Sequence, residues 1–278
     1  MSTIKTNQLA HTANGASVYT LPTTDGSAGQ VLKTDGSGNL SWVAQPTGIS
    51  EIDTWFMTAT INGTVDPDAA QSAVTELQEA ANGGDAWYCQ SDITKPRAAA
   101  SLFDEALSFT GQIDILVSNA SVQRFMPFQE VTEEDIDYQY SANFKAAFVL
   151  IQRALERMRE RRWGRIVTIG SVQEETFNEK FAPYGALKAA QTHLVKSLAK
   201  SFSGEGITFN NIAPGLIDTV RNEDFLADSE AKQEIVSRIP LGRVGQPEDC
   251  SGAALLLCSQ AGAYITGANI FVEGGIRL

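Results

Sequence analysis

Three residues of this chain could form a proton-transfer site: Ser171, Tyr184 and Lys188. A free phenol has a pKa of about 10, so a tyrosine exchanges protons near neutrality only when its phenolate is stabilised. Lys188 follows Tyr184 by four positions in a segment whose apolar spacing is helical, and such side chains share one helix face. The ammonium is therefore expected near the phenol, where it would lower the pKa of the tyrosine.

Ser171 directly follows an apolar, strand-like run at residues 165–170. A hydroxyl at the carboxyl end of a strand points into the crevice where open α/β sheets bind ligands. This hydroxyl is expected to hydrogen-bond the reacting oxygen of a substrate. Together the three side chains predict acid–base chemistry on an alcohol or a carbonyl group.

The order Ser171, Tyr184, Lys188 resembles the active-site motif of the short-chain dehydrogenase/reductase family, and other family motifs occur in the expected order between residues 68 and 278. A lone Tyr-x-x-x-Lys is common by chance, whereas an ordered set is far more specific. The further motifs are Asp92 in Ser-Asp-Ile-Thr, Asn119-Ala120 in Ser-Asn-Ala, Asn143 in Ala-Asn-Phe-Lys, Pro214-Gly215 with Thr219, and the segment 264–275.

The resemblance implies an enzyme, an oxidoreductase that interconverts a secondary alcohol and a ketone with NAD or NADP. It implies that Tyr184 is the acid/base and that Lys188 supports it and binds the nicotinamide ribose. It also implies that Ser171 binds the substrate oxygen and that Asn143 anchors a proton-relaying water. A small alcohol or carbonyl compound is the expected substrate.

The same resemblance assigns the cofactor contacts. Asp92 would hold the adenine, and Asn119 with Ala120 would lie beneath the adenine ribose. Pro214, Gly215 and Thr219 would contact the nicotinamide. The choice between NAD and NADP stays open, because its determinant follows a strand that this chain lacks.

The sequence departs from the family at the phosphate-binding loop. Family members begin with a strand that runs into Thr-Gly-x-x-x-Gly-x-Gly and a helix, where glycines let the backbone approach the pyrophosphate. No such segment precedes Asp68, and residues 24–31 have the wrong spacing and are typical of turns. The expected fold is therefore α/β, an incomplete Rossmann-like parallel sheet with flanking helices, and cofactor binding is expected to be impaired.

Residues 1–67 form a different kind of sequence, rich in Gly, Thr and Ser. Thr-Asp-Gly-Ser occurs at residues 24–27 and again at 34–37, which predicts short strands joined by tight turns. The segment resembles parts of phage tail-fibre and virion structural proteins. We therefore expect a fibre-like segment at residues 1–67 and a reductase-like domain at 68–278. Strands are predicted at residues 18–21, 30–32, 39–43 and 54–61.

From residue 69 onward, helical and strand patterns alternate, and strands separated by crossover helices predict a parallel sheet. In the family, the strand missing here lies in the middle of that sheet. N-terminal strands, another chain, or a re-paired strand 85–90 could fill the gap. Strands are predicted at 85–90, 113–117, 165–170, 207–212 and 269–273, and helices at 69–81, 97–109, 132–161, 184–202 and 247–259.

Composition excludes several functions. The net charge of −12 and the pI of about 4.6 argue against binding to nucleic acid or to an anionic membrane surface. No apolar stretch reaches transmembrane length, and the N-terminus lacks the apolar core of a signal peptide, so a soluble cytoplasmic protein is expected. The three cysteines have no metal-site spacing, which predicts reduced thiols and no metal. The resemblance adds a homo-oligomer paired through residues 132–161 and 184–202 and through the C-terminal strand region.

Several alternatives remain open. Asp92 could cap a turn, Asn119 could pin one, and Asn143 could be an ordinary polar helix residue. Gln173 could bind a polyol substrate or face water, as could Glu174 and Glu175. Residues 216–241 could be a substrate lid or a plain surface helix pair. The whole chain could also be a catalytically silent chimera or truncated relic that serves as a structural or interaction module.

Overall fold

The computed structural model describes residues 8–10, 18–20, 30–34, 40–44, 71, 74, 75, 78 and 85–278. The chain divides into two compact units, Met1–Asp53 and Thr54–Leu278, and each unit is described by itself.

The first unit contains two antiparallel strand pairs. β1 (Gln8–Ala10) pairs with β2 (Val18–Thr20), and β3 (Gln30–Thr34) pairs with β4 (Leu40–Ala44). The last three strands confirm predicted strands, whereas β1 was not predicted. The strand predicted at 54–61 lies outside the described residues.

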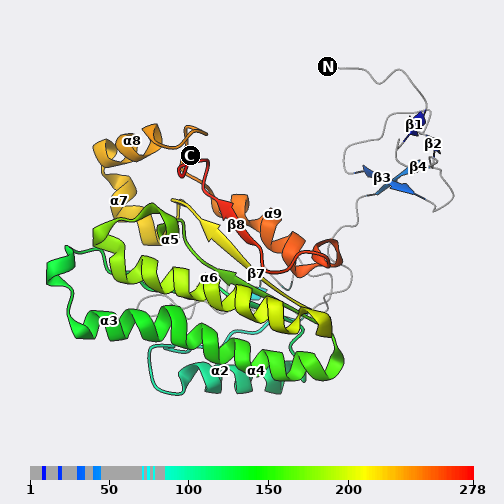
Figure 1. The fold of residues 1–278 in the computed structure, drawn as a ribbon, viewed down its shortest axis with the longest axis horizontal. Coiled ribbons are helices and arrows are strands. Elements are labelled where there is room, and N and C mark those ends of the chain that lie inside the picture. Colours follow the sequence, from blue (N-terminus) through cyan, green and yellow to red (C-terminus); the bar gives the residue numbers. More distant parts are fainter. Residues whose placement is uncertain are drawn as a thin grey trace. The chain divides into compact units, whose positions relative to one another are not determined.

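The second unit is built on a parallel sheet of four described strands, in the order β5-β6-β7-β8 (Figure 1). Each strand lies within two residues of a predicted one, which confirms the α/β class. Parallel pairing aligns Ser118 with Thr168 and Ile169 with Ile212, so the carboxyl ends of β5, β6 and β7 meet at one edge. The strands are β5 (Ile115–Ser118), β6 (Gly164–Ile169), β7 (Ile207–Pro214) and β8 (Asn269–Val272).

Helices lie on both sides of this sheet (Figure 1). On one side α2 (Ala98–Thr110), α4 (Ala146–Arg161) and α6 (Ala182–Phe202) share a buried core with Ile166 and Phe209 of the strands. On the other side α9 (Pro247–Cys258) packs on Val167 and Ile212. Alternate strand residues therefore face opposite helix layers, as the two-residue period of a strand requires.

The long predicted helix is interrupted by a wider turn. α3 (Glu133–Tyr140) begins at Thr132, whose hydroxyl accepts from the Asp135 amide while the Asp135 carboxylate accepts from Thr132, which confirms the capping box. A π-helical turn, η2 (Ser141–Lys145), then joins α3 to α4. The apolar spacing predicted the helix but not this turn, which carries Asn143.

Shorter helices connect the main elements and form the segment 216–241. That segment contains a helix pair, as predicted, preceded by one short turn. The shorter helices are η1 (Phe128–Glu130), α5 (Gln173–Thr176), η3 (Glu179–Phe181), η4 (Ser203–Glu205), η5 (Val220–Asn222), α7 (Glu223–Ala227), α8 (Ser229–Ser237) and η6 (Gln260–Gly262).

The strand predicted at 85–90 is wrong. Asp85 makes an isolated bridge, and residues 86–90 adopt no regular structure. Trp87 stacks on Phe109 of α2 with ring centroids 5.7 Å apart, and Ala86 is buried. A strand exists only through pairing, and β5 pairs with β6 alone among the described strands.

Within the described residues, no helix combines the length and hydropathy needed to cross a membrane. The helix predicted at 69–81 lies mostly outside them, although residues 71, 74, 75 and 78 are helical.

Candidate active site

The candidate site lies at the carboxyl ends of β5, β6 and β7. Ser171 follows β6, where the backbone amides of Gly170 and Val172 donate to carbonyls of Ile212 and Pro214 at 2.7 and 2.9 Å. These bonds hold the turn against β7. The Ser171 hydroxyl is nearly buried and accepts a hydrogen bond from the amide of Gln173 at 3.2 Å.

Tyr184 is brought to Ser171, as predicted, by the first turn of α6. Its side chain is 4% exposed and makes hydrogen bonds with the hydroxyls of Ser171 and Ser121. Burial raises the pKa of Tyr184, because the phenolate would lose its hydration, while Arg221 and the two serine hydroxyls lower it. The net direction is the opposite of the lowered pKa that the sequence suggested.

Lys188 lies over the ring of Tyr184. Its Nζ atom is 5.7 Å from the ring centroid and donates to the carbonyl of Ile169 at 2.7 Å. Lys188 is 1% exposed, and burial followed by the nearby Arg221 lowers its pKa from 10.5 to about 7. Spacing of four residues predicted the proximity correctly. It could not predict that burial would lower the pKa of the lysine and so reduce its charged fraction.

Asn143 fixes the loop that follows β5. Its side-chain carbonyl accepts from the amide of Val122 at 3.0 Å, and its amide donates to the carbonyl of the same residue at 2.8 Å. Asn143 is fully buried. The side chain therefore connects the π-helical turn η2 to the loop at residues 118–122, so it is more than an ordinary polar helix residue.

The acidic residues after Gln173 have partners within the protein. Glu174 accepts hydrogen bonds from Thr192, at 2.6 Å, and from Asn269. Glu175 pairs with Arg277 near the C-terminus. Gln173 is half-buried, and its side-chain carbonyl accepts from Thr176 at 2.9 Å. Both carboxylates therefore have protein partners, Glu175 is also exposed to water as one alternative expected, and of the three Gln173 stays the candidate for a substrate contact.

Some of the predicted cofactor residues lie along the same sheet edge. Asn119 and Ala120 follow β5, and Gly215 follows β7 so closely packed on β8 that an added Cβ would lie 2.8 Å from the Glu273 backbone. Thr219 is exposed between β7 and η5. The residues at this edge that could hold the nicotinamide half of a dinucleotide are Lys188, Pro214, Gly215 and Thr219.

Asp92 is a turn residue in this structure. Its carboxylate accepts from the amide and the hydroxyl of Thr94, at 3.0 and 2.6 Å, and pairs with Lys95. The Thr94 hydrogen bond lowers the pKa of Asp92. Nothing in residues 1–278 matches Thr-Gly-x-x-x-Gly-x-Gly, so the sequence provides no glycine-rich cradle of that type for the pyrophosphate.

Two residues that the sequence did not single out belong to the site. Ser121 follows the Ser-Asn-Ala motif directly and hydrogen-bonds Tyr184. Arg221, from η5, donates to the Ser121 hydroxyl at 2.7 Å. The signal for Ser121 was its position one residue past a family motif, whereas Arg221 has no local signal and is 100 residues away in sequence.

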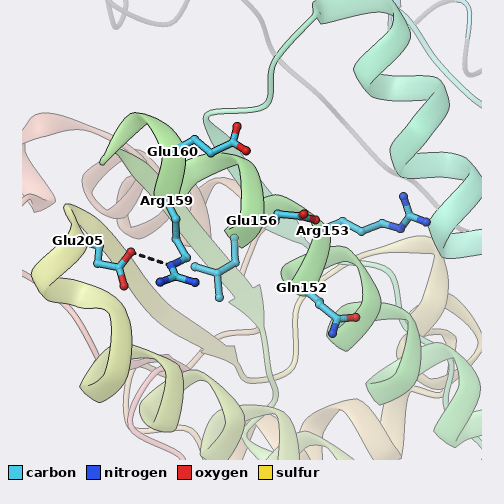
Figure 2. A pocket seen from close by; sticks show the side chains of 7 residues that line it. Gln152, Arg153, Glu156, Arg159, Glu160 and Glu205 are labelled. Carbon is cyan, nitrogen blue, oxygen red and sulfur yellow. Dashed lines mark hydrogen bonds and ion pairs between the residues drawn. The ribbon is translucent and has the colours of Figure 1, made fainter.

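A separate open hollow lies on the outer surface of α4 (Figure 2). Arg159 donates to Glu205 across it at 2.7 Å, and Glu205 lies two residues before the amino end of β7. The hollow therefore lies toward the amino ends of the strands, away from Tyr184. Its lining residues are Gln152, Arg153, Leu155, Glu156, Arg159, Glu160 and Glu205, none of which was predicted as a site residue.

Comparisons with known proteins agree with this arrangement. A family model described as enoyl-(acyl carrier protein) reductase matches residues 59–277. The 3beta-hydroxysteroid dehydrogenase 1 of Eggerthella lenta is 35% identical over 223 residues, which are 80% of this chain and 85% of that relative. The chain belongs to the short-chain dehydrogenase/reductase family.

Solved structures of short-chain dehydrogenase/reductases share the fold. The 3-oxoacyl (acyl-carrier-protein) reductase of Agrobacterium tumefaciens C58 with NADP bound superimposes with a TM-score of 0.71 at 36% identity, covering 76% of this chain and 81% of that one. The gluconate 5-dehydrogenase of Burkholderia cenocepacia J2315, in complex with NADP and tartrate, gives a TM-score of 0.70 at 30% identity, with 76% and 82% covered.

Proposed function

We propose that this protein is an NAD(P)-dependent oxidoreductase that interconverts a secondary alcohol and a ketone. The observation that carries the proposal is the hydrogen bond between Ser171 and Tyr184, beside the buried Lys188, at the carboxyl edge of a parallel sheet. In open α/β sheets that edge is where ligands bind. Membership of the short-chain dehydrogenase/reductase family supports the same chemistry.

Each of the site residues has a role in this proposal. Ser171 donates a hydrogen bond to the substrate oxygen, and Tyr184 gives that oxygen a proton in reduction or takes one in oxidation. Lys188 lies over the tyrosine ring, within the same buried region, where it would hold the nicotinamide ribose. Asn143 positions the loop after β5 through Val122 and is proposed to order a proton-relaying water. The nicotinamide cofactor, when bound, exchanges a hydride with the substrate carbon.

The cofactor is proposed to be NAD or NADP, held with impaired affinity. Lys188, Asn119, Ala120, Pro214, Gly215 and Thr219 are placed to bind its nicotinamide side, with Asp92 as the proposed adenine contact. Structures of similar proteins have been solved with NADP bound. The absence of the family glycine motif from the sequence supports the impairment, because backbone N–H groups of that loop bind the pyrophosphate.

The substrate is proposed to be a small polar hydroxy or keto compound, sugar-like or an oxoacyl compound, with Gln173 as a hydrogen-bonding contact. Relatives named gluconate 5-dehydrogenase and 3-oxoacyl reductase support this class. The cytoplasmic location and the division at residues 67 and 68, with a fibre-like first part, stay predictions. The segment 216–241 is proposed as the substrate lid.

A second candidate function is a catalytically silent module, a chimera or truncated relic. The missing glycine motif favours it, since a reductase without bound cofactor transfers no hydride. The intact arrangement of Ser171, Tyr184 and Lys188 favours the enzyme.

We also propose that the protein forms a homo-oligomer through the outer face of α3 and α4. Residues at four-residue spacing form an apolar stripe there, with Tyr140 stacked on Phe144 and Phe144 packed against Phe148. Ile136, Tyr140 and Phe148 are 46, 42 and 42% exposed. A continuous exposed apolar stripe of this kind is typical of a protein contact.

Replacing Tyr184 with phenylalanine tests the proposed function. The variant keeps the ring in the core but loses the hydroxyl that transfers the proton, so carbonyl reduction with NADH or NADPH is expected to fall by at least about 100-fold. Absorbance of the reduced nicotinamide measures the rate on a panel of polar ketones. The matched control is Tyr264→Phe, because Tyr264 is fully exposed on the surface. Undiminished reduction by Tyr184→Phe would place the chemistry elsewhere, and no turnover by the natural protein would favour the silent module.

A further inference from the structure

Arg221 makes a two-armed contact across the candidate site. It belongs to η5 in the segment 216–241, and its partner Ser121 lies in the loop after β5. One guanidinium nitrogen donates to the Ser121 hydroxyl at 2.7 Å, and the other donates to the Ser121 carbonyl at 2.5 Å. Both terminal guanidinium nitrogens of Arg221 thus bind the same residue, so the contact fixes the orientation of the Ser121 hydroxyl as well as the position of Ser121.

The Ser121 hydroxyl also hydrogen-bonds Tyr184. A serine hydroxyl has one hydrogen to donate and two lone pairs that accept, whereas a guanidinium can only donate. Because the hydroxyl accepts from Arg221 through a lone pair, its own hydrogen is free to be donated to the oxygen of Tyr184. A hydrogen-bond chain therefore runs from Arg221 through Ser121 to Tyr184, and successive bonds in such a chain strengthen one another.

We propose that Arg221 is a positioning residue for Tyr184. By binding Ser121, it makes the serine hydroxyl donate to the tyrosine oxygen. It does so only when segment 216–241 lies against the loop after β5. The hydrogen-bond chain does not depend on the proposed function, but its effect on turnover rests on the proposed function. The segment is thereby coupled to proton transfer, because its movement away would remove a donor and a positive charge from the tyrosine.

The other groups around Tyr184 are consistent with this role. Burial is the main influence and raises the pKa of the tyrosine. Arg221 is the strongest influence in the opposite direction, followed by the hydroxyls of Ser171 and Ser121, while Glu174 of α5 adds to the rise. Lys188 lies over the ring and is only partly charged near pH 7, since its pKa is about 7. Arg221 is therefore the group best placed to favour the phenolate.

The test is the ionisation of Tyr184 in three variants of the full chain. Nuclear magnetic resonance of protein labelled with ¹³C at tyrosine Cζ follows each phenol during a pH titration, and Tyr184→Phe assigns the signal among the six tyrosines. Arg221→Gln and Ser121→Ala are both expected to move the Tyr184 titration to higher pH. The double variant is expected to move it no further than the larger single change, because both act through one chain.

Arg238→Gln is the matched control, because Arg238 is an exposed arginine in the same segment whose side chain makes no hydrogen bond or ion pair to the described residues. Its titration is expected to match that of the natural protein. The proposal is overturned if Ser121→Ala leaves the Tyr184 titration unchanged, since Arg221 would then act through its charge alone. An unchanged titration in Arg221→Gln overturns it as well.

A second readout is used for any variant that unfolds during the titration before the Tyr184 phenol ionises. The Cζ shift at neutral pH reports the hydrogen bonding of the hydroxyl, so it is expected to change in Arg221→Gln and Ser121→Ala and to stay constant in Arg238→Gln. An unchanged shift in the first two variants overturns the proposal. Neither readout needs cofactor or turnover. A protein without activity would contradict the proposed function while leaving this result intact.

Discussion

At the scale of single residues, spacing predicted which side chains meet but not their charge states. Tyr184 and Lys188 meet because residues four apart share a helix face, and Ser171 joins them from the end of β6. Their pKa values depend on burial, which a sequence does not show. Both side chains are almost fully buried, so burial shifts the pKa of each toward its neutral form, against the expected pairing of phenolate with ammonium.

The depressed pKa of Lys188 predicts a specific dependence of stability on pH. Below about pH 7 the lysine is charged in both the folded and the unfolded chain, and the folded state bears the cost of burying that charge. Between about pH 7 and 10.5 the unfolded chain holds a proton that the folded chain lacks, so the unfolding free energy rises with pH. From pH 7 to 9 the gain is on the order of 2 kcal/mol.

Urea unfolding at pH 7, 8 and 9 would measure this gain in the natural protein and in Lys188→Met. The variant, with no amine to titrate, is expected to lack the rise, and Lys196→Met, which removes an exposed lysine of the same helix, is expected to keep it. Tyr184 opposes the trend only as pH approaches about 10, where the tyrosine of the unfolded chain begins to ionise while the folded chain keeps its proton, which is why the range stops at 9. Parallel curves for Lys188→Met and the natural protein would contradict a neutral buried lysine.

At the scale of elements, strong periodic patterns were enough to predict the helices, whereas the pairing of strands could not be predicted from such patterns. The capping box at Thr132 and the apolar spacing of α4 and α6 predicted those helices. The π-helical turn η2 was not predicted, because one extra residue in a turn barely disturbs the apolar spacing of a helix. The predicted strand 85–90 failed for another reason. Its residues have strand-like composition, but a strand also needs a neighbour, and Trp87 packs on α2 instead.

The element that the sequence lacks predicts weak cofactor binding. A pyrophosphate is normally held by backbone N–H groups of a glycine-rich turn at a helix N-terminus, and the chain contains no such motif. Fluorescence titration of reduced NAD and NADP into the full chain is therefore expected to give dissociation constants well above about 1 μM, the equivalent of roughly 8 kcal/mol. Gly215→Val, which would collide with the Glu273 backbone at the nicotinamide side, is expected to weaken binding further. Tight binding by the natural chain would show that other residues replace the loop.

At the scale of the whole molecule, the reductase-like part has an exposed face that its own sequence pattern explains. A single amphipathic helix needs one apolar stripe for its core, and α4 has Leu150, Ile151 and Met158 buried there. The second stripe, which runs through Tyr140 and Phe148, has no place in that core. Its side chains instead stack on one another along the helix surface.

Light scattering of Phe148→Glu tests the proposed oligomer. The natural protein is expected to be a dimer or a larger symmetric assembly at micromolar concentration, because covering the stripe removes apolar surface worth about 25 cal/mol per Å². A carboxylate in the middle of the stripe would be buried without a partner, so the variant is expected to be monomeric with unchanged circular dichroism. Leu255→Glu is the control, since Leu255 is a comparably exposed apolar residue, 47%, on α9. A monomeric natural protein, or an oligomer that survives Phe148→Glu, would remove α3 and α4 as the contact.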